Sequence, residues 1–160
     1  MTKEEFKFCF DKYINQLRSY VYYRSGNQSI ANDIVQDVFL KLWEKDFQFE
    51  ENKIKNLLYK MTNNAFIDYC RKNKRSTESI NSLELGFTNN EPEVRYEYQE
   101  FKNKYEKALA GLPEKQRVVF LMSRVENLKY KEIAERLNVS QKAIEKRMSL
   151  ALKMLKQKLK

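Results

Sequence analysis

Apolar residues recur every three or four positions over residues 31–45 and leave a polar face opposite them. This spacing predicts an amphipathic helix with one side in a hydrophobic core. The core side would be formed by Ile34, Val35, Val38, Phe39, Leu42 and Trp43. At about 100° per residue, the outer side carries an acidic ridge formed by Asp33, Asp37, Leu40 and Glu44, with Gln36 beside it. Solvation alone accounts for such a ridge, although its charge also suits a basic protein partner.

A second helical pattern covers about residues 54–72. Its inner face would be formed by Ile54, Leu58, Met61 and Ala65, while the pattern turns Tyr59, Asn63, Phe66 and Cys70 elsewhere. The helix runs into a basic cluster formed by Arg71, Lys72, Lys74 and Arg75. Aromatic rings beside cations can stack on unpaired bases, but such rings more often form a second packing surface, so both interpretations stay open.

The loop between these two helices, residues 46–53, carries Phe47 and Phe49. Aromatic residues in a loop need either a pocket to fill or a ligand to meet. The loop is therefore a candidate binding element beside the second helix.

Three further helices are predicted near the carboxyl end. Pro113 suits the start of the first, which continues to about residue 126, and the second spans roughly Tyr130–Leu137. Asn138 tolerates the left-handed conformation of a turn, and Ser140 suits the N-cap of the third helix. The angle between the helices would be fixed by Ile133, Ala134, Leu137, Val139 and Ile144. The pattern predicts a helix-turn-helix, with a plain helical hairpin as the alternative.

The exposed face of the third helix would enter the major groove if the motif reads DNA. That face carries Gln141, Lys142, Glu145, Lys146 and Ser149. Gln can pair with adenine, Lys with guanine and Glu with cytosine at the base edges. Arg147 and Lys153 could instead hold phosphate. Each of these residues, taken singly, is also compatible with a solvated face.

Composition supports an all-α fold of two small domains. The 160 residues include 3 Gly, 2 Pro and 33% charged residues, which favours helices over turn-rich sheets. Charge is uneven, with 14 basic against 10 acidic residues through Arg75, 3 against 6 over residues 76–105, and 14 against 6 thereafter. Residues 76–92 lack helical periodicity, which predicts a linker between two domains, with a long surface loop within one domain as the alternative. We expect a domain over residues 1–75, an acidic linker over 76–104 and a helix-turn-helix domain over 105–160.

The sequence lacks the residues on which most catalytic sites depend. It has no His and no glycine-rich phosphate loop, and Cys9 and Cys70 match no metal or redox spacing. No stretch reads as a signal peptide or a membrane span. We therefore expect a cytoplasmic protein that is neither an enzyme nor embedded in a membrane, with no catalytic residue, metal, cofactor or small-molecule substrate. Its net charge of +9 favours nucleic acid or another acidic partner.

Three stretches, in this order and spacing, resemble the extracytoplasmic-function sigma factors of the RNA polymerase sigma-70 family. They are ANDIVQDVFLKLW at 31–43, LLYKMTNNAFIDYCRKNKR at 57–75, and LPEKQRVVFLMSRVENLKYKEIAERLNVSQKAIEKRMSLALKML at 112–155. The resemblance implies a factor that binds core RNA polymerase, directs initiation at particular promoters and opens the DNA there.

The resemblance also implies roles for particular residues. In this family the ridged helix binds the clamp helices of the β′ subunit, which implies core-polymerase contacts at Asp33, Gln36, Asp37, Leu40 and Trp43. The loop and the helix after it capture a flipped base of the minus-ten element, which places Phe47, Phe49, Met61 and Asn64 near that pocket, with further DNA contacts at Arg71, Lys72, Lys74 and Arg75. Binding energy would then offset the cost of unstacking the bases.

The carboxyl domain would read the minus-thirty-five element as duplex DNA. The residues implied are Ser140, Gln141, Lys142, Glu145, Lys146, Arg147 and Ser149. Glu145 departs from the family pattern, because many members carry Lys or Arg there.

The expected partners are the β′ clamp helices and the β subunit of core polymerase, promoter DNA and an anti-sigma factor. One alternative is a helix-turn-helix transcriptional regulator with an amino-terminal sensing domain, although the first half lacks the strand and helix alternation of a receiver domain. Another is an RNA-binding or nucleic-acid-modifying enzyme, which the absence of His and of a phosphate loop disfavours.

Overall fold

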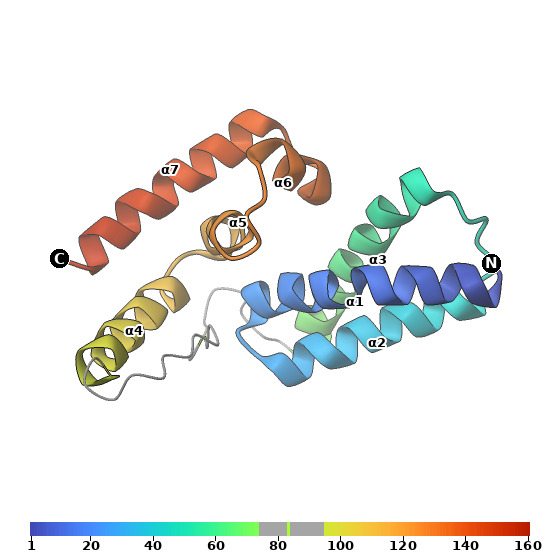
Figure 1. Ribbon diagram of the computed structural model, residues 1–160, viewed down its shortest axis with the longest axis horizontal. Helices are drawn as coiled ribbons and strands as arrows, with labels where there is room; N and C mark the ends of the chain where they lie inside the picture. Colours follow the sequence, from blue (N-terminus) through green and yellow to red (C-terminus); the bar gives the residue numbers. More distant parts are fainter. Residues whose placement is uncertain (74–82, 84–94) are drawn as a thin grey trace.

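The computed structural model describes residues 1–73, 83 and 95–160, and within them every regular element is a helix (Figure 1). The first half contains α1 (Lys3–Ser25), α2 (Gln28–Glu44) and α3 (Glu51–Lys72). The second half contains α4 (Arg95–Ala110), α5 (Glu114–Arg124), α6 (Tyr130–Leu137) and α7 (Gln141–Lys158). This confirms the all-α prediction.

A tight turn folds α2 back along α1 (Figure 1). Gly26 ends α1 with φ 64°, a left-handed conformation that glycine adopts without steric cost. The side chain of Asn27 then caps α2 by accepting a hydrogen bond of 3.1 Å from the backbone N–H of Ile30. The apolar side predicted for residues 31–45 packs inward as expected, except that Trp43 is 50% exposed.

Helix α3 is buried on two sides. Ile54 and Leu58 lie in the core as predicted, but Met61 is only partly buried. Tyr59 and Phe66, which the helical pattern turned away from the inner face, are 3% and 1% exposed. They belong to a second packing surface, because α3 contacts α1 and α2 on one side and α6 of the second half on another.

The helix-turn-helix forms as predicted from α5, α6 and α7. Helix α6 has the predicted bounds, and Asn138 ends it in the left-handed conformation with φ 54°. Ser140 caps α7 by accepting a hydrogen bond of 3.1 Å from the backbone N–H of Ala143. Ile133 and Ile144 are fully buried where the helices cross.

Helix α4 begins at Arg95, within the range 76–104 that the sequence predicted as a linker. Leu83 is buried in the common core. The rest of the predicted linker, together with Lys74 and Arg75, lies outside the described residues. The division into two domains remains a prediction.

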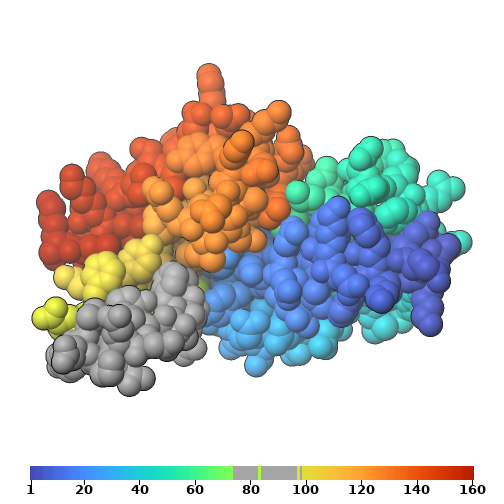
Figure 2. All heavy atoms as spheres, viewed as in Figure 1, coloured from blue at the N-terminus to red at the C-terminus, as the bar shows by residue number. Residues whose placement is uncertain are grey.

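The two halves pack directly against each other, with α5 on α1 and α6 on α3 (Figure 2). Arg117 of α5 lies at the centre of this contact and is fully buried. Its guanidinium donates to the carbonyl oxygens of Tyr23 at 2.6 Å and Arg24 at 3.0 Å, and to those of Leu112 at 2.8 Å and Ala110 at 3.4 Å. One side chain thus satisfies backbone carbonyls of both halves, including some that the end of α1 leaves unpaired.

Replacing Arg117 should destabilise the whole chain. In Arg117→Met the four carbonyl oxygens lose their donor in a buried place, which should lower the free energy of unfolding by about 3 kcal/mol. Urea unfolding followed by circular dichroism measures this. Lys115→Met changes an exposed residue of the same helix and should cost less than about 0.5 kcal/mol. Equal losses in the two variants would contradict the role given to Arg117.

Candidate functional site

An apolar groove of about 410 Å³ runs between the start of α1 and the end of α2. It is lined by Lys3, Phe6, Phe10, Gln36, Phe39, Leu40 and Trp43. The ring centroids of Phe6 and Trp43 lie 5.1 Å apart, as do those of Phe10 and Phe39. Leu40 is 56% exposed, so the groove presents apolar surface to solvent. An exposed apolar patch with polar edges is typical of a protein-binding surface.

The residues predicted to bind core polymerase lie in and beside this groove. Gln36, Leu40 and Trp43 line it, while Asp33 and Asp37 are exposed on the same helix. The acidic ridge therefore faces outward, as its spacing predicted. The sequence analysis did not predict that α1 forms one wall of this groove. The aromatic residues at alternate positions, Phe6, Phe8 and Phe10, were a signal, because a single helix face cannot bury all three rings.

The residues predicted at the minus-ten element do not gather at one point. Phe49 lies just before α3, partly buried, with its ring 6.0 Å from that of Phe8, and Phe47 is also partly buried against the core. Asn64 is exposed about 20 Å further along α3, at 1.5 Å rise per residue. Met61 lies between them, packed against the core.

The basic residues at the end of α3 are only partly described. Arg71 and Lys72 are exposed in the last turn, where cations also complement the helix dipole. The predicted contacts Lys74 and Arg75 lie outside the described residues. Arg71 lies 3.9 Å from the carboxylate of Asp68 one turn earlier, so Lys72 is the cation of this turn for which the structure shows no ion pair.

Asn64 belongs instead to a polar groove of about 470 Å³ between α3 and α6. Its α3 side carries Asn56, Lys60 and Asn63 as well, and the other side is formed by the end of α6 and its cap, residues 135–138. At one edge Arg136 donates a hydrogen bond of 3.2 Å to the hydroxyl of Tyr59. Burial raises the pKa of the Tyr59 phenol well above its usual range, so the hydroxyl stays neutral.

Arg136 also lies 3.8 Å from the carboxylate of Glu126 in the turn after α5. Burial raises the pKa of the Glu126 carboxyl, and the nearby guanidinium acts in the opposite direction. The pairs Arg136–Tyr59 and Arg136–Glu126 fix this side chain between the halves. The helical pattern alone could not reveal the contact between the halves, because Tyr59 is 77 residues away from Arg136 in sequence.

The residues predicted to read duplex DNA occupy the first three turns of α7. Exposed side chains on these turns are Gln141, Lys142, Glu145, Lys146 and Ser149. Arg147 is half-buried and lines a groove of about 620 Å³ between the halves, beside Arg24 and Glu114. Ser140 is exposed, and its hydroxyl accepts the capping hydrogen bond of α7.

Among the described residues, no three His, Cys, Asp or Glu side chains are grouped as metal ligands. Within the same part of the chain no helix combines the length and apolar character of a membrane span. The described surfaces are an apolar groove beside α1 and α2, a polar groove between α3 and α6, a groove of mixed lining between the halves, and the exposed face of α7.

Two matches to known families define the class of this protein as a transcription initiation factor. Residues 9–76 match the family described as Sigma-70 region 2, and residues 102–155 match Sigma-70, region 4. Together the matches cover more than half of the chain, so it belongs to the sigma-70 family of RNA polymerase sigma factors. The first half is thus a sigma region rather than a sensing domain.

Its relatives identify the type of sigma factor. The chain is 24% identical over 141 residues to the ECF RNA polymerase sigma factor SigM of Bacillus subtilis. The aligned region covers 88% of this chain and 85% of the relative. It is 29% identical over 149 residues to the RNA polymerase sigma factor SigZ of the same organism, covering 92% of this chain and 83% of the relative. The chain is a sigma factor of the extracytoplasmic-function type.

A solved structure shares the fold. The sigma factor RpoE of Bartonella quintana, crystallised with the anti-sigma factor NepR, superposes with a TM-score of 0.66. The match is 22% identical and covers 98% of this chain and 97% of that one. The helical architecture of both halves is therefore that of a known sigma factor.

Substitutions of Ser140 should distinguish its role as the N-cap of α7 from any contact that it makes with a ligand. Ser140→Ala removes the acceptor for the Ala143 N–H and should lower the free energy of unfolding by about 1 kcal/mol. Ser140→Asp keeps a capping oxygen and should retain stability within about 0.5 kcal/mol. Thermal and urea unfolding of the two variants test this. A loss in Ser140→Asp as large as in Ser140→Ala would show that the cap is not the cause.

Proposed function

We propose that this sigma factor binds core RNA polymerase through the groove between α1 and α2. The observation that supports it best is the juxtaposition of half-exposed apolar side chains, Leu40 and Trp43, with the outward carboxylates of Asp33 and Asp37. Apolar surface gives affinity, and the carboxylates select a basic partner. The partner surface would be the β′ clamp helices, with the β subunit as a further contact.

The function at the promoter follows from the other two surfaces. Helix α3 offers the polar side chains Asn56, Lys60 and Asn64 on one face, chemistry that suits the bases and phosphates of an opened strand. Phe47 and Phe49 lie near its other end, so a captured minus-ten strand would follow the length of α3. Strand opening would be driven by binding, because contacts to unstacked bases offset the cost of unpairing them.

The exposed face of α7 would read the minus-thirty-five element as duplex. Gln141, Lys142 and Glu145 lie at the start of the helix, where a recognition helix meets base edges. Lys146 and the other exposed cations of this half would hold phosphates, in keeping with the 14 basic against 6 acidic residues over 106–160.

In this proposal the factor acts in the cytoplasm, where polymerase and promoters are, and contributes binding energy rather than catalysis. An anti-sigma factor is an expected partner, by analogy with the RpoE structure, which contains one.

Reversing one charge of the ridge should prevent polymerase binding. In Asp37→Arg a cation replaces an exposed carboxylate that makes no structural contact we observe, and repulsion from a basic partner should raise the Kd for core polymerase at least about tenfold. Fluorescence anisotropy with purified core measures this. Glu100→Arg makes the same charge change at an exposed position of α4 and should leave the Kd unchanged. Unchanged affinity of Asp37→Arg would remove the ridge from the interface.

The proposed function as a whole is tested by run-off transcription. Purified core polymerase with this chain should give transcripts from a subset of promoters in a library, and core alone should not. The promoters selected would define the minus-ten and minus-thirty-five sequences. The absence of any promoter-dependent transcript with active core would refute the proposal.

A further inference from the structure

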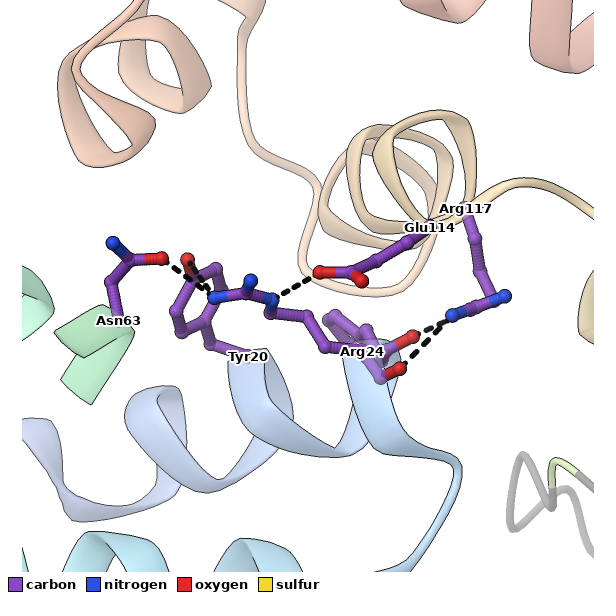
Figure 3. A network of polar contacts seen from close by, with 6 residues as sticks. Tyr20, Arg24, Asn63, Glu114 and Arg117 are labelled. Carbon is purple, nitrogen blue, oxygen red and sulfur yellow. Dashed lines mark hydrogen bonds and ion pairs between the residues drawn. The ribbon is translucent and has the colours of Figure 1, made fainter. Parts of the chain in front are cut away.

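Most acidic residues of the second half lie in contacts within the protein. Residues 106–160 contain six, all of them Glu. Glu114 pairs with Arg24 of α1 (Figure 3), and the carboxylate of Glu126 lies 3.8 Å from Arg136. Three more have a place in the fold, namely the ion pair of Glu106 with Lys102, the hydrogen bond that Glu132 accepts from Lys129, and the groove between α3 and α6 that Glu135 lines. These five carboxylates therefore have neighbours of their own within the protein.

Glu145 differs from these five residues. It is exposed on α7, and no ion pair or hydrogen bond to another described residue involves its carboxylate. It also lies beyond the first turn of the helix, where a carboxylate would complement the helix dipole, and the N-cap is provided by Ser140. The fold gives no role to this carboxylate, which leaves it available to a ligand.

The exposed face of α7 divides into two ridges. Gln141, Glu145 and Ser149 follow each other at intervals of four residues. Lys142 and Lys146 do the same about 80° further round the helix. The basic ridge suits the phosphates of DNA, because contacts to phosphate depend on charge and not on sequence. The first ridge carries no cation, so it suits base edges instead.

A carboxylate on this face restricts the DNA that α7 can bind. Phosphates repel it, so it lowers the affinity for DNA of any sequence. In the major groove it can accept a hydrogen bond from the N4 amino group of cytosine. Guanine presents the acceptors N7 and O6 there, which would leave the carboxylate desolvated without a donor. Glu145 is therefore suited to discriminate between bases rather than to add affinity.

We propose that Glu145 selects cytosine at one position of the minus-thirty-five element and rejects guanine there. This role deepens the proposed function and rests on it, because Glu145 can select a base only if α7 reads duplex DNA. Gln141 and Ser149, one turn to either side, would contact neighbouring base pairs. Since the preferred base depends on the side chain, exchanging Glu145 should exchange the base.

A promoter selection with purified core polymerase and the full chain tests this role. In run-off transcription from templates with a randomised minus-thirty-five element, the wild-type chain should enrich C over G at one position by at least about tenfold. Glu145→Ala should lose this preference at that position alone, so that C and G differ by less than about threefold. Glu145→Lys should prefer G there, because Lys donates to guanine N7 and O6.

Lys146→Ala is the matched control on the neighbouring ridge. It removes a cation predicted to hold phosphate, so it should weaken transcription from all templates about equally and keep the preference for C. Because Glu145 is exposed and has no partner among the described residues, Glu145→Ala and Glu145→Lys should unfold at the wild-type temperature in circular dichroism.

Selection of cytosine by Glu145 is overturned if no position in the wild-type selection prefers C, or if Glu145→Ala selects the same element as the wild-type chain. It is also overturned if Lys146→Ala changes the preference at that position as much as Glu145→Ala does. In each of these cases promoter-dependent transcripts from the wild-type chain keep the proposed function, and only the role of Glu145 fails. A wild-type chain that gives no promoter-dependent transcript contradicts the proposed function and this role together.

Discussion

The arrangement of the molecule depends on the buried guanidinium of Arg117. A helix end leaves carbonyl oxygens without partners, and α1 ends at the point where α5 begins in space. Arg117 donates to the carbonyl oxygens of Tyr23 and Arg24 there, and also to those of Ala110 and Leu112 in its own half. Burial lowers its pKa only to about 10, so the group stays charged at neutral pH. Its charge is compensated by the dipoles of these carbonyl groups and by the nearby carboxylate of Glu114, and the hydrogen bonds hold three chain segments around it.

The sequence predicted those parts of the fold that depend on local rules. The bounds of α6, the left-handed Asn138 and the cap at Ser140 follow from turn and capping chemistry within a few residues. The outward acidic ridge follows from helical period alone. The second buried face of α3 did not follow, because Tyr59 is covered by Arg136, which is 77 residues away in sequence. A helical pattern cannot state which of two apolar faces meets the other half of the chain.

The candidate surfaces likewise combine features that follow from local sequence with features that depend on tertiary contacts. The α2 side of the apolar groove could be listed from residue spacing. Its α1 side could not, because Phe6 and Phe10 reach Trp43 and Phe39 only through the fold. The resemblance to sigma factors placed Phe49 and Asn64 near one pocket, whereas the structure separates them along α3. A family resemblance names the residues that bind a ligand. The distance between these residues along the helix then determines which of them can contact the same nucleotide.

The apolar groove between α1 and α2 has a consequence for the protein in solution. Two copies of the chain could bury Leu40 and Trp43 against each other, which would make the groove a site of self-association. A net charge of +9 opposes that encounter by repulsion between copies. Because the Debye length shortens to about 3 Å at 1 M salt, this repulsion acts only in dilute electrolyte. Raising the ionic strength should therefore weaken the repulsion that opposes this contact between copies.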